Sequence, residues 1–118
     1  MNEYYDADNN FIGVKREFIT VNKGDIHEIV KHYGAPKQKN KAVEELLELS
    51  EILIKDVNKN DNNLDGIYEE MADVYIMLEQ LVDIYDIDLE LLQQEVNRKI
   101  NRTFRRMKHI LDPDCGWR

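Results

Sequence analysis

Four acidic side chains in the middle of the chain are spaced so that they could act together. Glu45 and Glu48 are three residues apart, and so are Glu70 and Asp73. Residues i and i+3 lie on the same side of an α-helix, so each pair presents two carboxylates in one direction. Carboxylates held together repel one another unless water or a cation offsets the repulsion. Ligands made only of carboxylate oxygen favour Mg²⁺ or Mn²⁺, so the spacing predicts a divalent cation site.

The surroundings of these acids separate them from ordinary surface charges. Glu44 and Glu51 lie on the same predicted helix as the first pair, and we expect them to be solvated surface acids. Asp73 shares its helix side with Met77 and Gln80, which is an unusual setting for an acid that only faces water. The second pair is therefore the stronger indication of a site.

Histidine indicates which metals do not fit. A carboxylate di-iron bundle needs Glu-x-x-His on two helices. The three histidines, His27, His32 and His109, do not supply that motif. We therefore expect no redox iron, and we expect each histidine to be a helix-surface residue.

A basic segment near the end of the chain offers a second kind of chemistry. Lys99, Arg102 and Arg106 lie on one side of the last predicted helix, with Asn97 at its flank. Guanidinium forks and an ammonium group suit the oxygens of a polyphosphate. The alternative is a solvated basic face supported by pairing of Glu95 with Lys99. The spacing leaves both interpretations open.

The composition limits the classes of protein that fit. The 118 residues have a net charge of -8, with 42% hydrophobic and 34% charged residues, which is typical of one folded domain. The acid excess argues against a protein that coats nucleic acid, because phosphate neutralisation needs clustered Lys and Arg. Residues 1–96 nevertheless carry nine basic and 22 acidic side chains, whereas residues 97–118 carry seven and two.

The elements that must position these residues are predicted to be helices. Apolar periodicity and cap residues predict four of them, at Asp25 to Tyr33, Lys39 to Val57, Leu64 to Tyr85, and Leu89 to His109. Short connections between helices predict an all-α, four-helix-type bundle with mostly antiparallel neighbours, over residues 24–110. The third helix is apolar nearly all round, so we expect it to be enclosed centrally or by another subunit.

The two ends of the chain differ from this domain. Residues 1–23 are rich in tyrosine and β-branched residues around a turn-prone run, which predicts a short hairpin or an extended arm. Residues 111–118 form a tail in which we expect no catalytic role for Cys115 and packing on the bundle for Trp117. We see no secretory signal and no long apolar stretch, and so expect a cytoplasmic protein without a membrane segment.

These features together resemble a known family, the MazG-type all-α NTP pyrophosphohydrolases. Glu45-Leu46-Leu47-Glu48, followed 22 residues later by Glu70-Met71-Ala72-Asp73, is similar to the family's ExxE and ExxD motifs. The flanking segments 41–49 and 69–74 are also similar to its two motif helices. Asn97-Arg98-Lys99, followed by Arg102 and Arg106, resembles the family's downstream basic helix. The resemblance covers about residues 25–108.

The resemblance implies a reaction and a role for each residue. Such enzymes hydrolyse a nucleoside triphosphate to a monophosphate and pyrophosphate. Carried over, the four acids would bind Mg²⁺, or Mn²⁺, and Glu45 or Glu48 would orient the attacking water. Asn97, Lys99, Arg102 and Arg106 would lie at the phosphates. The resemblance also implies a homodimer or homotetramer, with sites near subunit interfaces.

Several alternatives remain open at the level of sequence. The same fold serves dUTPases and the phosphoribosyl-ATP pyrophosphohydrolases of histidine synthesis. A non-enzymatic helical interaction module would carry the acids as a solvated face. Nucleic-acid binding by the basic helix is a third class, and the acid excess counts against it.

Overall fold

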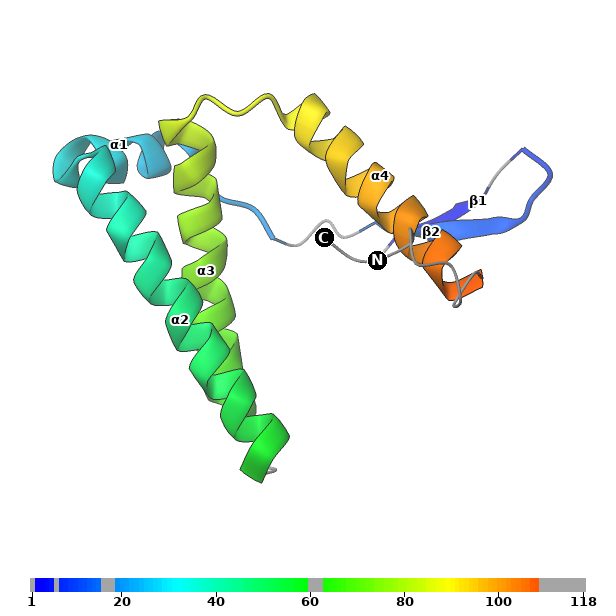
Figure 1. The fold of residues 1–118 in the computed structure, drawn as a ribbon. Coiled ribbons are helices and arrows are strands. Elements are labelled where there is room, and N and C mark those ends of the chain that lie inside the picture. Colours follow the sequence, from blue (N-terminus) through cyan, green and yellow to red (C-terminus); the bar gives the residue numbers. More distant parts are fainter. Residues whose placement is uncertain (1, 6, 16–18, 60–62, 109–118) are drawn as a thin grey trace.

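The computed structural model describes residues 2–5, 7–15, 19–59 and 63–108. Over these residues the chain forms a short β-hairpin followed by four α-helices (Figure 1). The elements are β1 (Asn2–Tyr5), β2 (Phe11–Lys15), α1 (Lys23–Tyr33), α2 (Ala35–Lys59), α3 (Leu64–Ile84) and α4 (Leu89–Lys108). The predicted all-α class is confirmed, with strands confined in the described residues to the N-terminal arm.

The arm is the hairpin that the sequence offered as one of two possibilities. β1 and β2 pair antiparallel, with Asn2 opposite Lys15 and Tyr4 opposite Gly13, and the register shifts between Tyr4 and Tyr5. His109, Cys115 and Trp117 lie outside the described residues, as does the expected tail 111–118.

The second helix begins earlier than predicted. Gly34 ends α1 by adopting φ 89°, and its N–H donates to the carbonyl of Val30 at 2.8 Å. Such left-handed backbone is available to glycine without strain. α2 then starts at Ala35, four residues before the expected Lys39. Pro36 is accommodated there because the first turn of a helix needs no N–H donor.

The helices α1, α2 and α3 pack together. Figure 1 shows α2 and α3 running side by side, with α1 lying across one end of this pair. Within the described residues, the buried apolar side chains are Ile26, Val30, Ala42 and Met77. Two glutamines are buried with them, and Gln38 Nε2 donates to Gln80 Oε1 at 2.8 Å. This bond joins α2 to α3 close to Met77.

Replacing Gln80 with Leu should destabilise this junction. The substitution leaves the buried Nε2 of Gln38 without its acceptor, and a buried unsatisfied donor costs about 1–3 kcal/mol. Chemical denaturation of the variant and the wild type should show that difference in unfolding free energy. An unchanged value would mean that the two glutamines do not hold α2 against α3. Glu69→Gln is the control, because Glu69 is exposed on the same helix, whereas Glu79 beside Gln80 is half-buried.

The position of α4 differs from the predicted bundle. Among the residues that the structure describes, α4 does not pack on α1, α2 or α3. Figure 1 shows it leaving the top of α3 and running away from the other helices. The enclosure expected for α3 is likewise absent from the described single chain, where Tyr68 and Met71 are 69% and 57% exposed.

Candidate metal centre

The four acids predicted to act together meet at one place in the structure. Glu45 and Glu48 come from α2, and Glu70 and Asp73 from α3. One carboxylate oxygen from each lies within 4.8 Å of the corresponding oxygens of the other three. We call these four residues the acidic cluster. Its spacing is compatible with four oxygens around a cation.

Local structure explains how the two pairs come to face each other. Each pair sits at positions i and i+3 and therefore on one side of its helix. α2 and α3 lie against each other, and the turn into α3 is fixed by Asn63, whose Oδ1 accepts a hydrogen bond from the N–H of Gly66 at 3.0 Å. A Cβ at Gly66 would lie 2.5 Å from Nδ2 of Asn63 and 2.6 Å from Cδ1 of Ile52 on α2, so a larger residue there would require these side chains to shift.

Two oxygens of the cluster are buried without a partner. Glu45 is only 6% exposed, and its Oε1 forms an ion pair with Nζ of Lys41 at 3.1 Å. Its Oε2, like Oε2 of Glu70, is shielded from solvent and makes no hydrogen bond to any described residue. Leaving a carboxylate oxygen buried and unsatisfied is costly. A bound cation would satisfy both oxygens, so the residues fit a hard divalent metal.

The pKa values of two carboxyls in the cluster are raised by the crowding of these acids. The carboxyl of Glu45 raises the pKa of Glu48, first because a protonated Glu48 could donate a hydrogen bond to it and second through its negative charge. Burial, followed by the charge of Glu45, raises the pKa of Asp73. Both carboxyls are therefore harder to ionise than in water, which is the expected state of carboxylates crowded together without a cation.

These shifts predict opposite effects of pH on stability and on metal binding. An acid whose pKa is raised on folding favours the folded state below its unfolded pKa, and this contribution is lost as the pH rises through the folded pKa. Metal binding needs the ionised carboxylates, so affinity should increase over the same range. Titration calorimetry with Mn²⁺ between pH 5 and 8, in roughly half-unit steps, should show tighter binding at higher pH. A flat profile would show that Glu48 and Asp73 do not ligate the ion.

A cavity opens beside the acidic cluster. It has a volume of about 440 Å³, and its lining includes Glu48 and Glu70 from the cluster. The other lining residues are Glu51, Ile52, Lys55 and Asn63. Glu51 is exposed, as expected, yet it borders this cavity. Lys55 brings a positive charge to the rim of a site that is otherwise acidic.

Sequence reasoning missed the lysines of the site. Lys41 precedes Glu45 by four residues, which is the spacing of an intrahelical ion pair. Lys55 follows Glu48 by seven residues, so two helical turns place both side chains on the same side of α2. Both spacings are visible in the sequence and could have identified these residues.

The residues predicted to contact phosphates lie on α4. Asn97 accepts a hydrogen bond from Gln93 Nε2 at 3.0 Å, and Lys99, Arg102 and Arg106 are half-buried. Because α4 does not pack on α2 or α3 within the described part of the chain, the single protomer does not bring them to the acidic cluster.

The ion pair observed for Glu95 involves a different partner from the expected Lys99. Arg98 Nη2 lies 2.8 Å from Glu95 Oε2, and its guanidinium lowers the pKa of that carboxyl. Both side chains are more than half exposed, so the pair contributes little to stability.

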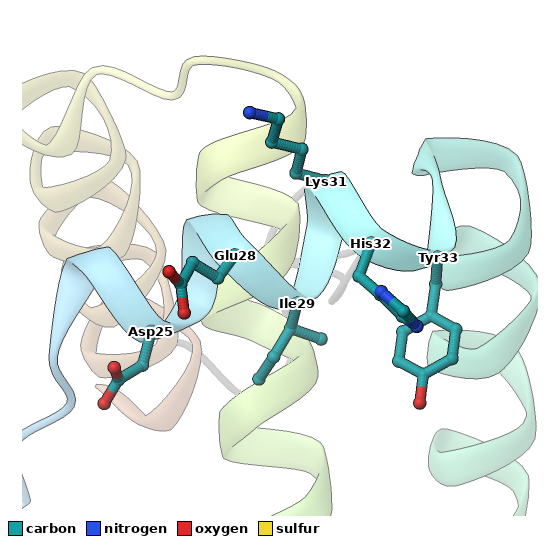
Figure 2. A pocket seen from close by; sticks show the side chains of 6 residues that line it. All are labelled: Asp25, Glu28, Ile29, Lys31, His32 and Tyr33. Atoms are coloured by element: carbon teal, nitrogen blue, oxygen red, sulfur yellow. The ribbon is translucent and has the colours of Figure 1, made fainter.

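A larger hollow lies on α1 but lacks the features of a site. It has a volume of about 830 Å³ and is open to solvent, and Figure 2 shows its lining side chains spread along one helix. They are Asp25, Glu28, Ile29, Lys31, His32 and Tyr33. His32 stacks edge-on against Tyr33, with the ring centroids 4.6 Å apart. None of the acidic cluster lines this hollow, so we assign the chemistry to the smaller cavity.

The remaining histidine of the described residues ties two helices together. Nδ1 of His27 on α1 lies 3.1 Å from Oδ2 of Asp83 on α3. His27 is 66% exposed at its side chain, so it is a surface residue, as expected.

Comparisons with known proteins leave the resemblance as a hypothesis. A scan against protein-family models, a search of curated proteins and a search of solved structures each find no match to this chain. In the part of the chain that the structure describes, no helix has the length and apolar character needed to cross a membrane.

Proposed function

We propose that this protein is a Mg²⁺-dependent nucleoside triphosphate pyrophosphohydrolase, releasing a nucleoside monophosphate and pyrophosphate. The observation that carries the proposal is the meeting of Glu45, Glu48, Glu70 and Asp73, from ExxE and ExxD motifs on two adjacent helices, with two buried and unpartnered oxygens. A solvated acidic face would leave those oxygens in water. The cavity beside the cluster provides space for the phosphates.

The four acids would hold Mg²⁺, with Mn²⁺ as a substitute. When bound, the metal would neutralise polyphosphate charge and make the phosphorus under attack more electrophilic. Lys41 forms an ion pair with Oε1 of Glu45. The other oxygen of that carboxylate, Oε2, is thereby left for the metal. Of the two acids expected to orient the attacking water, we favour Glu48, because it is exposed and lines the cavity, whereas Glu45 is buried and paired with Lys41.

Phosphate oxygens that do not face the metal need cationic partners of their own. Lys55 lines the cavity and is placed to contact them. The proposal also includes the polar residues of α4, which are Asn97, Lys99, Arg102 and Arg106. They would reach an acidic cluster only if α4 docks on the α2–α3 pair of another copy of the chain. The proposed enzyme is accordingly a homo-oligomer.

Replacing Lys55 with Ala should raise the KM for the nucleotide about tenfold and leave kcat within a factor of about three. The reason is that the substitution removes one charge-assisted contact that is made in both the ground state and the transition state. Lys59→Ala, on the same helix but away from this cavity, is the matched control and should behave as the wild type. Steady-state kinetics at saturating Mg²⁺ would measure both. Equal effects of the two substitutions would contradict the assignment of Lys55.

The test of the function is a substrate panel. The purified protein is incubated with the common NTPs and dNTPs, dUDP and phosphoribosyl-ATP, in Mg²⁺ and in EDTA, and the products are resolved by ³¹P NMR. The proposal expects pyrophosphate and a monophosphate from at least one triphosphate, in Mg²⁺ only. Activity on both dUTP and dUDP would identify a dUTPase, and activity confined to phosphoribosyl-ATP the histidine-pathway reaction. Folded protein that releases no pyrophosphate from any of them would refute the proposal.

A further inference from the structure

A cation that belongs to the protein itself lies at the acidic cluster. Nζ of Lys41 is 3.1 Å from Oε1 of Glu45 and 3.6 Å from Oε2 of Glu44. Glu45 raises the pKa of Lys41 most strongly, followed by Glu44 and Glu48. The pKa of Asp73, which burial and Glu45 raise, is partly lowered again by the charge of Lys41. The lysine therefore acts electrostatically on the cluster and not only on one neighbour.

Glu45 is the central carboxylate of the cluster. It is buried, and its carboxyl adjoins that of Glu48 on its own helix and that of Asp73 on α3. Two-metal sites hold their ions about 3.5–4 Å apart, and a carboxylate that gives one oxygen to each ion commonly joins them. A pair of ions in this cluster would need such a bridge from Glu45, because this carboxylate lies between the other acids.

The ion pair with Lys41 leaves Glu45 a single oxygen for metal. Oε1 faces the ammonium group, whereas Oε2 is shielded from solvent and makes no hydrogen bond to any described residue. An ion that binds Oε2 satisfies this buried oxygen. A second ion would have to displace Lys41 from Oε1. The bridge between two ions is therefore blocked while the ion pair is in place.

The spacing of the four carboxylates suits one ion. One oxygen from each lies within 4.8 Å of the corresponding oxygens of the other three. Oxygens on opposite sides of one Mg²⁺ are about 4.2 Å apart, because each lies about 2.1 Å from the metal. A small contraction of the cluster is enough to bring all four oxygens to a single ion.

The charge balance favours the same number. The four ionised carboxylates of the cluster carry a charge of -4, and Lys41 reduces it to -3. One divalent ion leaves -1, so a second ion would change the sign of the site to +1. Without the lysine, two divalent ions would neutralise the four carboxylates. Lys41 therefore weakens the attraction for a second ion much more than for the first.

We propose that Lys41 takes the place of a second metal ion, so that the protein without nucleotide binds one divalent ion per chain. Lys41 is then a positioning residue, because it acts through Glu45 and not on a substrate. The proposal rests on the metal site of the proposed function. It does not depend on which nucleotide, if any, the protein hydrolyses.

The direct test counts the Mn²⁺ ions that the full chain binds in the absence of nucleotide. Electron paramagnetic resonance measures the free Mn²⁺, and it also detects magnetic coupling between two Mn²⁺ ions joined by a carboxylate. We expect the wild type to bind one ion per chain without coupling. Lys41→Met keeps the apolar stem of the side chain and removes its charge. This variant should bind two ions per chain and show a coupled pair.

Two further variants separate the position of the charge from its presence. Lys37 lines the same cavity as Lys41, but its Nζ lies over the ring of Tyr33, 5.1 Å from the centroid. Lys37→Met removes the same charge from the same helix and should still bind one ion per chain. Lys41→Arg keeps the charge and should also bind one. Two ions on either of these variants would contradict the proposed role of Lys41.

A measurement on the wild type alone keeps the test decisive if Lys41→Met does not fold. In protein saturated with Mg²⁺, ¹⁵N NMR should still show the Nζ of Lys41 as an ammonium group hydrogen-bonded to a carboxylate. Release of that group by Mg²⁺, two ions on the wild type, or one ion on folded Lys41→Met would each overturn this proposal and leave the metal site standing. A wild type that binds no Mn²⁺ would refute the metal site as well.

Discussion

Glu70→Gln should reduce the rate of pyrophosphate release on the order of 10²–10³-fold, because it removes a charged ligand from the group that stabilises the transition state. The carboxamide keeps the shape of the side chain but supplies one neutral oxygen in place of a carboxylate. Kinetics at saturating Mg²⁺ and nucleotide would measure the loss as a change in kcat.

The neighbouring residue provides the matched control. Glu69 lies next to Glu70 on α3, is exposed, and is outside the acidic cluster. Glu69→Gln removes the same charge from the same helix and should stay within about twofold of the wild type. Comparable losses in the two variants would show that net charge, and not the cluster, governs turnover. An undiminished Glu70→Gln enzyme would show that the site lies elsewhere.

The second large effect is on thermal stability. The difference in melting temperature between Glu70→Gln and the wild type should have opposite signs in EDTA and in Mg²⁺. In EDTA, Glu70→Gln should melt at a higher temperature than the wild type, because it removes one of the crowded negative charges beside Glu48. With Mg²⁺ at a hundred times its Kd, the wild type should gain about 2.7 kcal/mol and rise by roughly 10 °C. The variant should gain little. Scanning calorimetry at one fixed protein concentration would measure both.

Three results would contradict this account of the cluster. A wild-type midpoint that does not respond to Mg²⁺ would support the alternative of a non-enzymatic module with a solvated acidic face. A variant that loses stability in EDTA would show that the cluster is not under electrostatic strain. Failure of Glu69→Gln to respond to Mg²⁺ as the wild type does would show that the stabilisation is nonspecific.

The acidic cluster was predictable because its geometry is mostly local. The i, i+3 spacing fixes Glu45 with Glu48 and Glu70 with Asp73, and the packing of α2 against α3 brings the pairs together. The start of α2 was less predictable. The spacing of apolar residues begins after Pro36, whereas the helix begins where Gly34 has ended α1.

The place of α4 could not be read from the sequence. Its amphipathic pattern predicts that it packs against something, and the helix itself is formed over Leu89–Lys108 as expected. The pattern does not say whether the partner surface belongs to the same chain. That choice depends on the direction in which the four-residue linker, with Asp86 at φ 48°, leaves α3. Because the packing partner of α4 is not given by its sequence, the sequence could not predict whether Arg102 lies near the acidic cluster.

The account depends most on the claim that the acidic cluster is one divalent cation site. The most direct measurement is paramagnetic broadening of backbone amide NMR signals by substoichiometric Mn²⁺ in the wild-type protein. We expect the signals of Glu45, Glu48, Glu70 and Asp73 to vanish first and those around Asp25 and Glu28 on α1 to persist. Broadening that begins on α1, or that spreads evenly over the acidic surface, would contradict the claim.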